Sequence, residues 1–352
     1  MTTLASAPNA LSPSFSVIGG DVVAAVLAGR HRTVLDLVEQ TYRAHGQGRT
    51  VNPHSHFLRF PERPEARIIA LPAAVSGARA ANGIKWISSY PRNTEHGLAR
   101  ASAVLILNDP DTGHPFACLE SSLISAARTA ASAALAADRL SAARPARERP
   151  RTVAFVGGGL IARHIHTYLV ETGWTFDRTA VFDADPARAE SFRASLGGHS
   201  ASGRTVVAAD AESAIRAGDL VVLATTAASP HIENPRALEH APLVLHVSLR
   251  DLSPRIITGA ANVLDDVDHC LRAETSVHLT EQLTGGRDFV TGTLPDFLSG
   301  AHTLPSDRPV VFSPFGLGVL DLALGRYVFE QAAASGRARP VEGFFPPPDA
   351  RG

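Results

Sequence analysis

Near the middle of the chain stands Arg151-Thr-Val-Ala-Phe-Val-Gly-Gly-Gly-Leu-Ile-Ala-Arg-His-Ile-His166, where a strand-like apolar run enters three glycines and then a helix-like run. Gly157 and Gly159 permit a tight turn and let bare backbone approach a pyrophosphate, while Ala162 takes the small position at which helix packs on strand. Phosphates would then meet the unpaired N–H groups at the start of the helix. The stretch therefore predicts a dinucleotide-binding turn, with a plain structural turn as the alternative.

A carboxylate follows at a suitable distance. The run Thr179-Ala-Val-Phe182 leads into Asp183, 26 residues after Gly157, near the offset of about 20 residues at which an acid binds the adenosine ribose hydroxyls. The charge of Asp183 would repel the 2′-phosphate of NADP, so the predicted cofactor is NAD. The other residues of this region and beyond that we expect to bind the cofactor are Leu160, Ile161, Arg188 and Arg100.

Short apolar strands alternate with helical segments after the turn. Strands are expected at 205–208, 220–224, 243–248 and 262–265, and a helix at 210–217. Such alternation is typical of a parallel sheet that is covered on both faces and binds ligands at the carboxyl ends of its strands. Thr225, Thr226 and Ser248 stand at two such ends and are candidate ribose and nicotinamide contacts. Ordinary turn chemistry explains the threonines equally well.

The composition favours a small-molecule partner. The 352 residues are 45% hydrophobic, which is enough chain for two domains, and a formal net charge of −1 without a long basic run argues against nucleic acid or an acidic membrane surface. Cys118 and Cys270 stand far apart, so neither a disulfide scaffold nor a cysteine zinc site is expected. Without a signal pattern or an uncharged apolar run of about 20 residues, a cytoplasmic protein is expected.

The regions on either side of the turn predict a second domain. Before it, helices are expected at 22–27, capped by Asp21, and at 34–42, then strands at 67–71, 83–88 and 103–108 and a long helix at 120–140. After it, 310–318 leads into a helix at 319–334 that the parallel sheet does not need. We therefore expect an α/β protein in which a Rossmann-type doubly wound parallel sheet domain, 149–307, is inserted into a discontinuous α+β substrate-binding domain, 15–148 plus 308–340. The segments 1–14 and 341–352 are expected to be loose tails.

Three basic residues before the turn are candidate substrate ligands. Lys85 lies in an apolar strand, where a solvated edge lysine is the alternative. Arg128 interrupts the apolar face of the long helix among residues too small to pair with its charge. A buried guanidinium requires an anion, which a substrate carboxylate or an internal salt bridge would supply. Arg59 is a candidate second clamp, and arginines beside Lys85 would lower its pKa and let it act as a base near neutral pH.

Two acids are candidate catalytic groups. Glu120 opens the long helix, where a favourable charge at the helix N-terminus is the commoner role. Asp251 follows a strand that would end near the cofactor crevice, with a turn aspartate as the alternative. The two His-X-His pairs of the chain come without carboxylates at metal-ligand spacing, so no metal is predicted.

Taken together, these residues resemble the ornithine cyclodeaminase and mu-crystallin superfamily over nearly the whole chain after residue 15. The runs that carry the resemblance are Asn52-Pro53 with Arg59, the Lys85 strand, Tyr90-Pro-Arg-Asn-Thr94, Arg128-Thr-Ala-Ala131, the Gly157 turn and Phe315-Gly-Leu-Gly-Val-Leu-Asp321. The resemblance implies that Arg59, Lys85 and Arg128 hold a substrate α-carboxylate beside the nicotinamide ring. It also implies that the discontinuous domain joins two chains in a homodimer.

Within the superfamily, the chain is similar to the dehydrogenases of 2,3-diaminopropionate biosynthesis, which serve siderophore and peptide-antibiotic pathways. The similarity lies in Arg67-Ile-Ile-Ala-Leu-Pro-Ala73, Gly83-Ile-Lys-Trp-Ile87, Arg100-Ala-Ser102, Ile106-Leu-Asn-Asp-Pro110 and the first turns of the long helix. It implies that NAD oxidises N-(1-amino-1-carboxy-2-ethyl)-glutamate at the glutamate α-carbon and that water splits the imine into 2-oxoglutarate and L-2,3-diaminopropionate. The alternatives are cyclodeamination or ketimine reduction of another amino acid, and a non-catalytic, crystallin-like NAD(P)H-binding protein.

Two positions depart from the cyclodeaminase pattern. Where those enzymes place a glutamate three residues before a strand-ending proline, this chain has Ile69. Where their catalytic aspartate is expected, Arg250 or Asp251 is in register, depending on a gap. An arginine at that place suits a substrate with additional carboxylates, and the substrate named above has three. Lys85 is the expected base, and Asp251 or Glu120 would activate the water.

Overall fold

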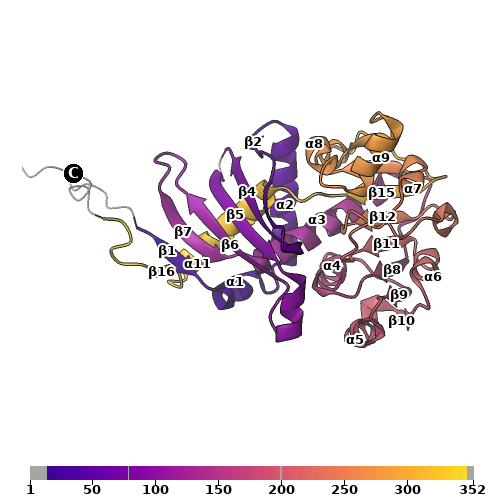
Figure 1. Ribbon diagram of the computed structural model, residues 1–352, viewed down its shortest axis with the longest axis horizontal. Helices are drawn as coiled ribbons and strands as arrows, with labels where there is room; N and C mark the ends of the chain where they lie inside the picture. The colour runs from indigo at the N-terminus through magenta and orange to yellow at the C-terminus, as the bar shows by residue number, and fades with distance from the viewer. Residues whose placement is uncertain (1–13, 78, 199, 347–352) are drawn as a thin grey trace, which may run out of the picture.

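The computed structural model describes residues 14–77, 79–198 and 200–346. The chain forms two large sheets that lie side by side, and the long helix α3 (Ser122–Ala142) packs against both (Figure 1). The fold is α/β as predicted, with a Rossmann-type parallel sheet inserted into an α+β unit whose sheet is mainly antiparallel.

The first sheet has the strand order β16-β1-β7-β6-β5-β4-β2, and β3 pairs with β4. Its strands are β1 (Ser16–Ile18), β2 (Thr50–Val51), β3 (His56–Phe60), β4 (Arg63–Val75), β5 (Ala81–Ser89), β6 (Ala101–Asn108), β7 (Pro115–Glu120) and β16 (Arg339–Pro340). The register places Lys85 opposite Leu71 on one side and Leu105 on the other. Because residues directly opposite each other on paired strands point to the same face, Lys85 shares its face of the sheet with Leu105 and Leu119.

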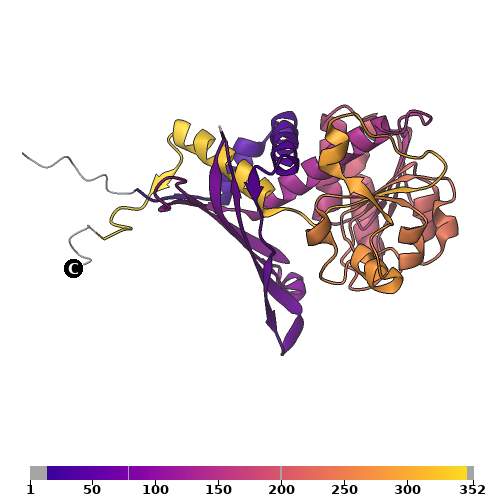
Figure 2. The same ribbon diagram turned by 90° about the horizontal axis from the view of Figure 1, so that it is seen from above.

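Helices cover only this face of the first sheet, as Figure 2 shows. They are α1 (Gly20–Leu27), α2 (His31–Gly46), α3 and α11 (Gly318–Ala334). Leu105 and Leu119 are fully buried beneath them, whereas Trp86 and Val104 on the opposite face are 42% and 40% exposed. One side of the first sheet therefore forms a core and the other presents apolar side chains to the surroundings.

The second sheet is parallel throughout, with the order β10-β9-β8-β11-β12-β15-β13-β14. Its strands are β8 (Thr152–Val156), β9 (Arg178–Phe182), β10 (Arg204–Val207), β11 (Leu220–Leu223), β12 (Leu243–His246), β13 (Ala261–Leu264), β14 (Val290–Thr293) and β15 (Val310–Ser313). Its helices are α4 (Leu160–Glu171), α5 (Pro186–Leu196), α6 (Ala211–Arg216), α7 (Pro254–Thr258), α8 (Val267–Cys270), α9 (Ser276–Thr284) and α10 (Leu294–Leu298). The strand order reverses between β8 and β11, which is where such sheets bind nucleotides.

The chain leaves the second sheet through its interior. β15 lies between β12 and β13, so the return to the first sheet begins after Ser313 and not at residue 308 as expected. The strand Val310–Ser313 is buried on both faces of the sheet. A short apolar run of this kind does not show from the sequence which of the two sheets it belongs to.

Several segments differ from expectation. The strands β1, β3 and β7 were not predicted. β1 is ordered by pairing with β7, far along the chain, whereas β3 and β7 form hairpins with β4 and β6, their neighbours in the chain. Asp21 does not cap α1, since the N-cap is Gly19 and Asp21 lies in the first turn. Part of the expected C-terminal tail is packed, with the Phe344 ring stacked on Phe15 at 3.9 Å. Residues 1–13 and 347–352 of the expected tails lie outside the described residues.

Among the helices of the described segments, none combines the length and the apolarity that crossing a membrane requires.

Candidate active site

The tight turn after β8 requires glycine at its first position. Gly157 has φ of +96°, and a Cβ there would stand 2.5 Å from the Ala224 carbonyl oxygen, so only glycine fits. The next amide, that of Gly158, donates a hydrogen bond of 2.7 Å to Asp183 Oδ2. The sheet thus brings Asp183, at the end of β9, directly beside the turn that it was predicted to accompany.

The N-terminus of α4 is left open for an anion. Its N-cap is Gly159, which supplies no side-chain cap, and a Cβ on Gly159 would meet no protein atom within 4 Å. Leu160 is 61% exposed at the first position of α4, while Ile161 packs partly against the core. The guanidinium of Arg188 lies 3.9 Å from Asp183 Oδ1, at the rim where the adenosine would rest. An open helix N-terminus beside a carboxylate fits a dinucleotide with free ribose hydroxyls.

Asp251 lies beneath the ends of β11 and β12. It is fully buried and accepts hydrogen bonds from the hydroxyls of Thr225 and Ser248, and His231 Nε2 lies 3.0 Å from its carboxylate. Burial alone would raise the pKa of Asp251, but hydrogen bonds from His231, His246 and Ser248 lower it far below its ordinary value. Its carboxylate is therefore ionised and surrounded by donors, which favours a role in fixing the hydroxyls of Thr225 and Ser248. Thr226 follows as an exposed residue.

Lys85 and Arg128 share one carboxylate. Lys85 Nζ donates to Asp321 Oδ2 at 2.7 Å, and Arg128 Nε donates to Asp321 Oδ1 at 3.1 Å. Arg128 was expected to lack a partner among its small neighbours, but α11 brings Asp321 from 193 residues away, so the internal salt bridge exists. Two buried cations still face one buried anion, and this surplus of positive charge favours a second, incoming carboxylate.

Burial has different effects on the two partners. It lowers the pKa of Lys85, and although Asp321 opposes this effect and Arg128 adds to it, the resulting pKa is about 8. For Asp321 burial acts upward, but the charges of Arg128 and Lys85 prevail and hold its pKa below the ordinary value. Lys85 is therefore the member of this group that exchanges a proton near neutral pH.

The loop after β15 fixes the position of Arg128. The carboxylate of Asp265, at the end of β13, accepts the amides of Phe315 and Gly316 at 2.8 and 2.7 Å. Gly316 has φ of +92°, and a Cβ there would lie 2.6 Å from Arg128 Nη1. The glycine of the Phe-Gly-Leu-Gly run thus makes room for the guanidinium.

A group of four further arginines lies farther along the same face. Arg59 on β3 is directly opposite Arg67 on β4, and Arg67 is opposite Ser89, which accepts a hydrogen bond of 2.9 Å from Arg100 Nη1. Arg250 approaches from the second sheet. Burial lowers the pKa of Arg67, and the charges of Arg250, Arg100 and Arg59 lower it further. We call Arg59, Arg67, Arg100 and Arg250 the arginine cluster.

None of the four has an acidic side chain within 4 Å in the described part of the chain. Arg100, which was expected to bind the cofactor, lies on the first sheet, where its hydrogen bond to Ser89 brings it near Arg67. Like charges opposite one another on neighbouring strands destabilise a sheet, so the cluster calls for an anion from outside.

Glu120 lies apart from these cations. Leu119 is in the same row as Lys85, so Glu120, the next residue of β7, points to the other face. Its carboxylate accepts the amides of Ser122 and Leu123 at 2.6 and 3.3 Å and thereby caps α3. This placement favours the commoner role of a negative charge at a helix N-terminus.

A cavity of about 300 Å³ opens between the two sheets next to this site. His54, Phe57 and Arg59 line it from the first sheet, and His269, Arg272, His278 and Phe315 line it from the other side. Within the described residues, no group of three or more His, Cys, Asp or Glu side chains is arranged to hold a metal ion.

Sequence reasoning missed Asp321, Arg67 and His269 as site residues. Asp321 stands in the Phe-Gly-Leu-Gly run that carried the resemblance, which was a usable signal. Arg67 also stands in such a run, but its role depends on strand register, and His269 depends on a contact between the two halves of the molecule.

Known proteins share both sequence and architecture with this chain. Residues 23–336 match the ornithine cyclodeaminase/mu-crystallin family. N-((2S)-2-amino-2-carboxyethyl)-L-glutamate dehydrogenase of Staphylococcus aureus is 28% identical over 315 residues, which cover 86% of this chain and 91% of that protein.

Two solved structures share the fold. The Δ1-pyrroline-2-carboxylate reductase of Thermococcus litoralis, in complex with NADH and L-proline, superposes with a TM-score of 0.83 at 20% identity and covers 93% of this chain and 100% of that one. An archaeal alanine dehydrogenase dimer with bound NAD gives 0.82 at 22% identity and covers 94% and 100%. The family match spans both sheets, the glycine turn and the Lys85–Arg128 site, and the chain therefore belongs to the ornithine cyclodeaminase/mu-crystallin family.

Proposed function

We propose that the protein is an NAD-dependent oxidoreductase acting on a C–N bond of an amino acid, with N-(1-amino-1-carboxy-2-ethyl)-glutamate as its substrate. The dehydrogenase of S. aureus named above acts on an amino acid conjugate of this kind. The products would be 2-oxoglutarate and L-2,3-diaminopropionate. The proposed NAD site consists of the Gly157 turn, the open end of α4, Asp183 and the hydroxyls held by Asp251.

The observation that carries this proposal is the spacing of two cationic groups along one face of β4 and β5. Arg67 and Ser89 stand four residues along their strands from Leu71 and Lys85, which corresponds to roughly 13 Å. A small amino acid with one carboxylate would engage the Lys85–Arg128 group and leave the arginine cluster without an anion. A conjugate with three carboxylates satisfies both groups, which is why it is favoured over ornithine or a cyclic imine.

The residues would divide the work as follows. Lys85 and Arg128 hold the glutamate α-carboxylate, and the arginine cluster holds the outer carboxylates, so that the reacting carbon is fixed in one orientation. The uncharged form of Lys85 accepts the proton of the secondary amine. When bound, NAD supplies hydride acceptance at the glutamate α-carbon. The closed face beneath α3 and α11 keeps bulk water from the buried end of the substrate.

The test is to add NAD and the conjugate to purified protein and to follow the absorbance of the reduced nicotinamide, with products identified by mass spectrometry. We expect NADH, 2-oxoglutarate and diaminopropionate in equal amounts. Proline formed from ornithine, or NADH consumed with a cyclic imine, would instead assign the protein to another reaction of the family.

Arg67→Gln tests the carboxylate argument. It should lower kcat/KM for the conjugate roughly tenfold to hundredfold, because a charged hydrogen bond is lost. Arg204→Gln on the far edge strand β10 is the matched control and should leave kcat/KM unchanged. Equal activity of the two variants would refute the proposed role of the arginine cluster.

A further inference from the structure

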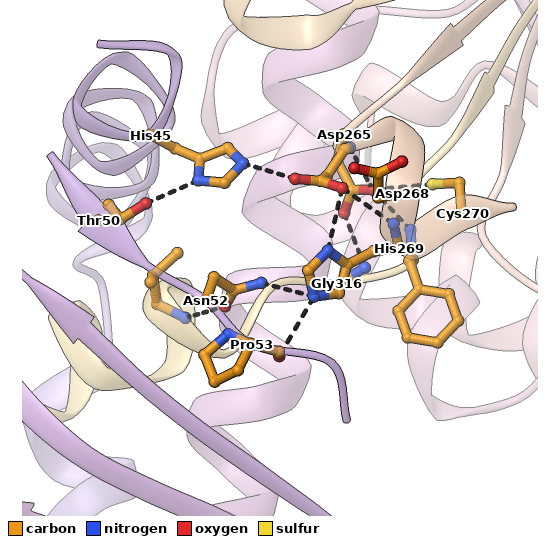
Figure 3. A network of polar contacts seen from close by, with 12 residues as sticks. His45, Thr50, Asn52, Pro53, Asp265, Asp268, His269, Cys270 and Gly316 are labelled. Carbon is orange, nitrogen blue, oxygen red and sulfur yellow. Dashed lines mark hydrogen bonds and ion pairs between the residues drawn. The ribbon is translucent and has the colours of Figure 1, made fainter. Parts of the chain in front are cut away.

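Asp266 lies between two histidines that come from opposite halves of the molecule. Figure 3 labels both of them, His45 and His269. His269 Nδ1, on α8, is 2.9 Å from Asp266 Oδ1, and His45 Nε2, on α2, is 3.0 Å from Oδ2. The other nitrogen of His45 is 2.7 Å from the hydroxyl of Thr50. Asp266 is thus fixed on both oxygens and in turn fixes the ring of His269.

His269 lies at the cavity that we assign to the substrate. His269 lines the 300 Å³ cavity together with Arg59. The centroid of its ring is 6.2 Å from that of Phe315, and the residue after Phe315, Gly316, makes room for the Arg128 guanidinium. His269 Nε2 is 3.0 Å from Asn52 Nδ2 and 3.3 Å from the Pro53 carbonyl. One neighbour donates and the other accepts, so this nitrogen has a partner both with and without a proton. Figure 3 shows both contacts converging on one nitrogen of the His269 ring.

The surroundings of His269 favour the protonated form of its ring. Burial alone would lower the pKa of His269, but the hydrogen bond and charge of Asp266, the Pro53 carbonyl and the charge of Asp265 raise it above the ordinary value. Burial acts on Asp266 in the opposite sense, yet the bonds from His269 and His45 lower its pKa strongly. The titratable and charged groups that face His269 are Asp265, Asp266, His45, His54, Arg59, Arg272 and His278.

The other candidates for the water step are already engaged. The carboxylate of Asp251 is bound by the hydroxyls of Thr225 and Ser248 and by the ring of His231. Glu120 accepts the first amides of α3 on the opposite face of the sheet. Lys85 is needed for the amine proton. His54, the next ring in the cavity, has a buried Nδ1 without a hydrogen-bond partner among the described residues, 5.1 Å between ring centroids from His269. A substrate in the cavity would meet both rings.

We propose that His269, oriented by Asp266 and braced by His45, is the catalytic residue that moves the proton during hydrolysis of the substrate imine. This inference rests on the proposed function. His269 Nε2 takes a proton from water as the water oxygen bonds to the imine carbon. It gives that proton to the imine nitrogen, which leaves a carbinolamine, and then moves the proton of the carbinolamine hydroxyl to the same nitrogen as the C–N bond breaks. A ketone and a primary amine are released, and His269 returns to its starting state. No group beyond water and the NAD-oxidised substrate is required.

The experiment separates oxidation from hydrolysis in single and multiple turnovers. His269→Asn retains an N–H at the place of Nδ1 and thus the contact with Asp266. We expect this variant to form one NADH per site at the wild-type rate and then to turn over roughly a hundredfold more slowly. Quenching with cyanoborodeuteride should return substrate that carries deuterium at the glutamate α-carbon, because the imine accumulates. His302→Asn, at an exposed histidine that does not line the cavity, is the control and should behave as wild type.

A second readout does not depend on turnover. In the protein without substrate, NMR titration should give His269 a pKa above that of an ordinary histidine, and Asp266→Asn should lower it. In the wild type the acid limb of the multiple-turnover rate should follow the same pKa, because only uncharged His269 accepts the proton of water.

The outcomes are distinct. If His269→Asn loses the NADH burst and the multiple-turnover rate to the same extent, the network is only a structural contact between the two halves. If the variant turns over at the wild-type rate, His269 has no role in hydrolysis. Wild-type protein that forms no NADH with the conjugate would contradict the proposed function itself, whereas the NMR titration would still test the Asp266–His269 pair.

Discussion

At the scale of single residues, the buried group of Lys85, Arg128 and Asp321 decides the pH behaviour of the oxidation step. Lys85 has a pKa of about 8, and only its uncharged form accepts a proton. The rate of the NADH burst should therefore rise with pH through about 8 and level off above it. Rapid-mixing measurements over this range check the expectation, and a flat profile would remove Lys85 as the base.

Asp321→Asn extends this prediction. Asp321 raises the pKa of Lys85, so its neutralisation should shift the limb of the burst rate to lower pH. The variant also leaves two buried cations without a buried anion, which costs about 3–5 kcal/mol of folding free energy. Its burst rate should therefore be measured at a temperature well below its thermal unfolding midpoint. Asp177→Asn, which removes an exposed ion pair with Arg151, is the control and should leave the limb in place.

At the scale of elements, a substitution in the strand–turn–helix unit can weaken cofactor binding without changing the stability of the fold. Gly159→Ala meets no protein atom and needs no unusual backbone angle, so its unfolding midpoint should equal that of the wild type. The added methyl would lie where backbone must approach the pyrophosphate, and we expect NAD to bind at least tenfold more weakly. Calorimetry of NAD binding checks this, with Gly286→Ala, also in open space, as the control. Unchanged affinity would move the phosphates elsewhere.

How far the sequence predicts the structure depends on how far apart the interacting residues are. The Gly157 turn, the parallel strands and the long helices follow from neighbouring residues, and they were predicted close to their observed bounds. The partner of Arg128 was not predicted, because Asp321 is 193 residues away in the sequence. The His45–Asp266–His269 network was not predicted either, because His45 is 221 residues from Asp266. Predicting cross-strand neighbours such as Arg59 and Arg67 requires the register of the two strands, and the alternation of apolar and polar residues along each strand does not provide it.

At the scale of the whole molecule, the bare face of the first sheet predicts association. Trp86 and Val104 are directly opposite each other there and Leu58 on β3 is 47% exposed, so apolar side chains extend across three strands. Contiguous exposed apolar patches of this kind often mark surfaces to which another protein surface binds. We propose that a second copy of the chain covers this face.

The change Trp86→Glu should therefore produce monomers, because it places a charge in the apolar contact. Light scattering after gel filtration measures the mass, and Leu283→Glu, at a 72% exposed position on α9, is the control. A wild-type protein that is monomeric at micromolar concentration, or a Trp86→Glu variant with unchanged mass, would show that another surface serves this purpose.

The position of β15 has a consequence for synthesis on the ribosome. β12 and β13 are not neighbours, and each pairs with β15, which follows both of them in the chain. The two parts of the second sheet therefore wait for Val310–Ser313 to leave the exit tunnel, and α11, with Asp321, emerges later still. Nascent chains truncated before residue 310 should remain open to proteases and chaperones, and neither half of the enzyme should acquire its native state before α11 has been synthesised.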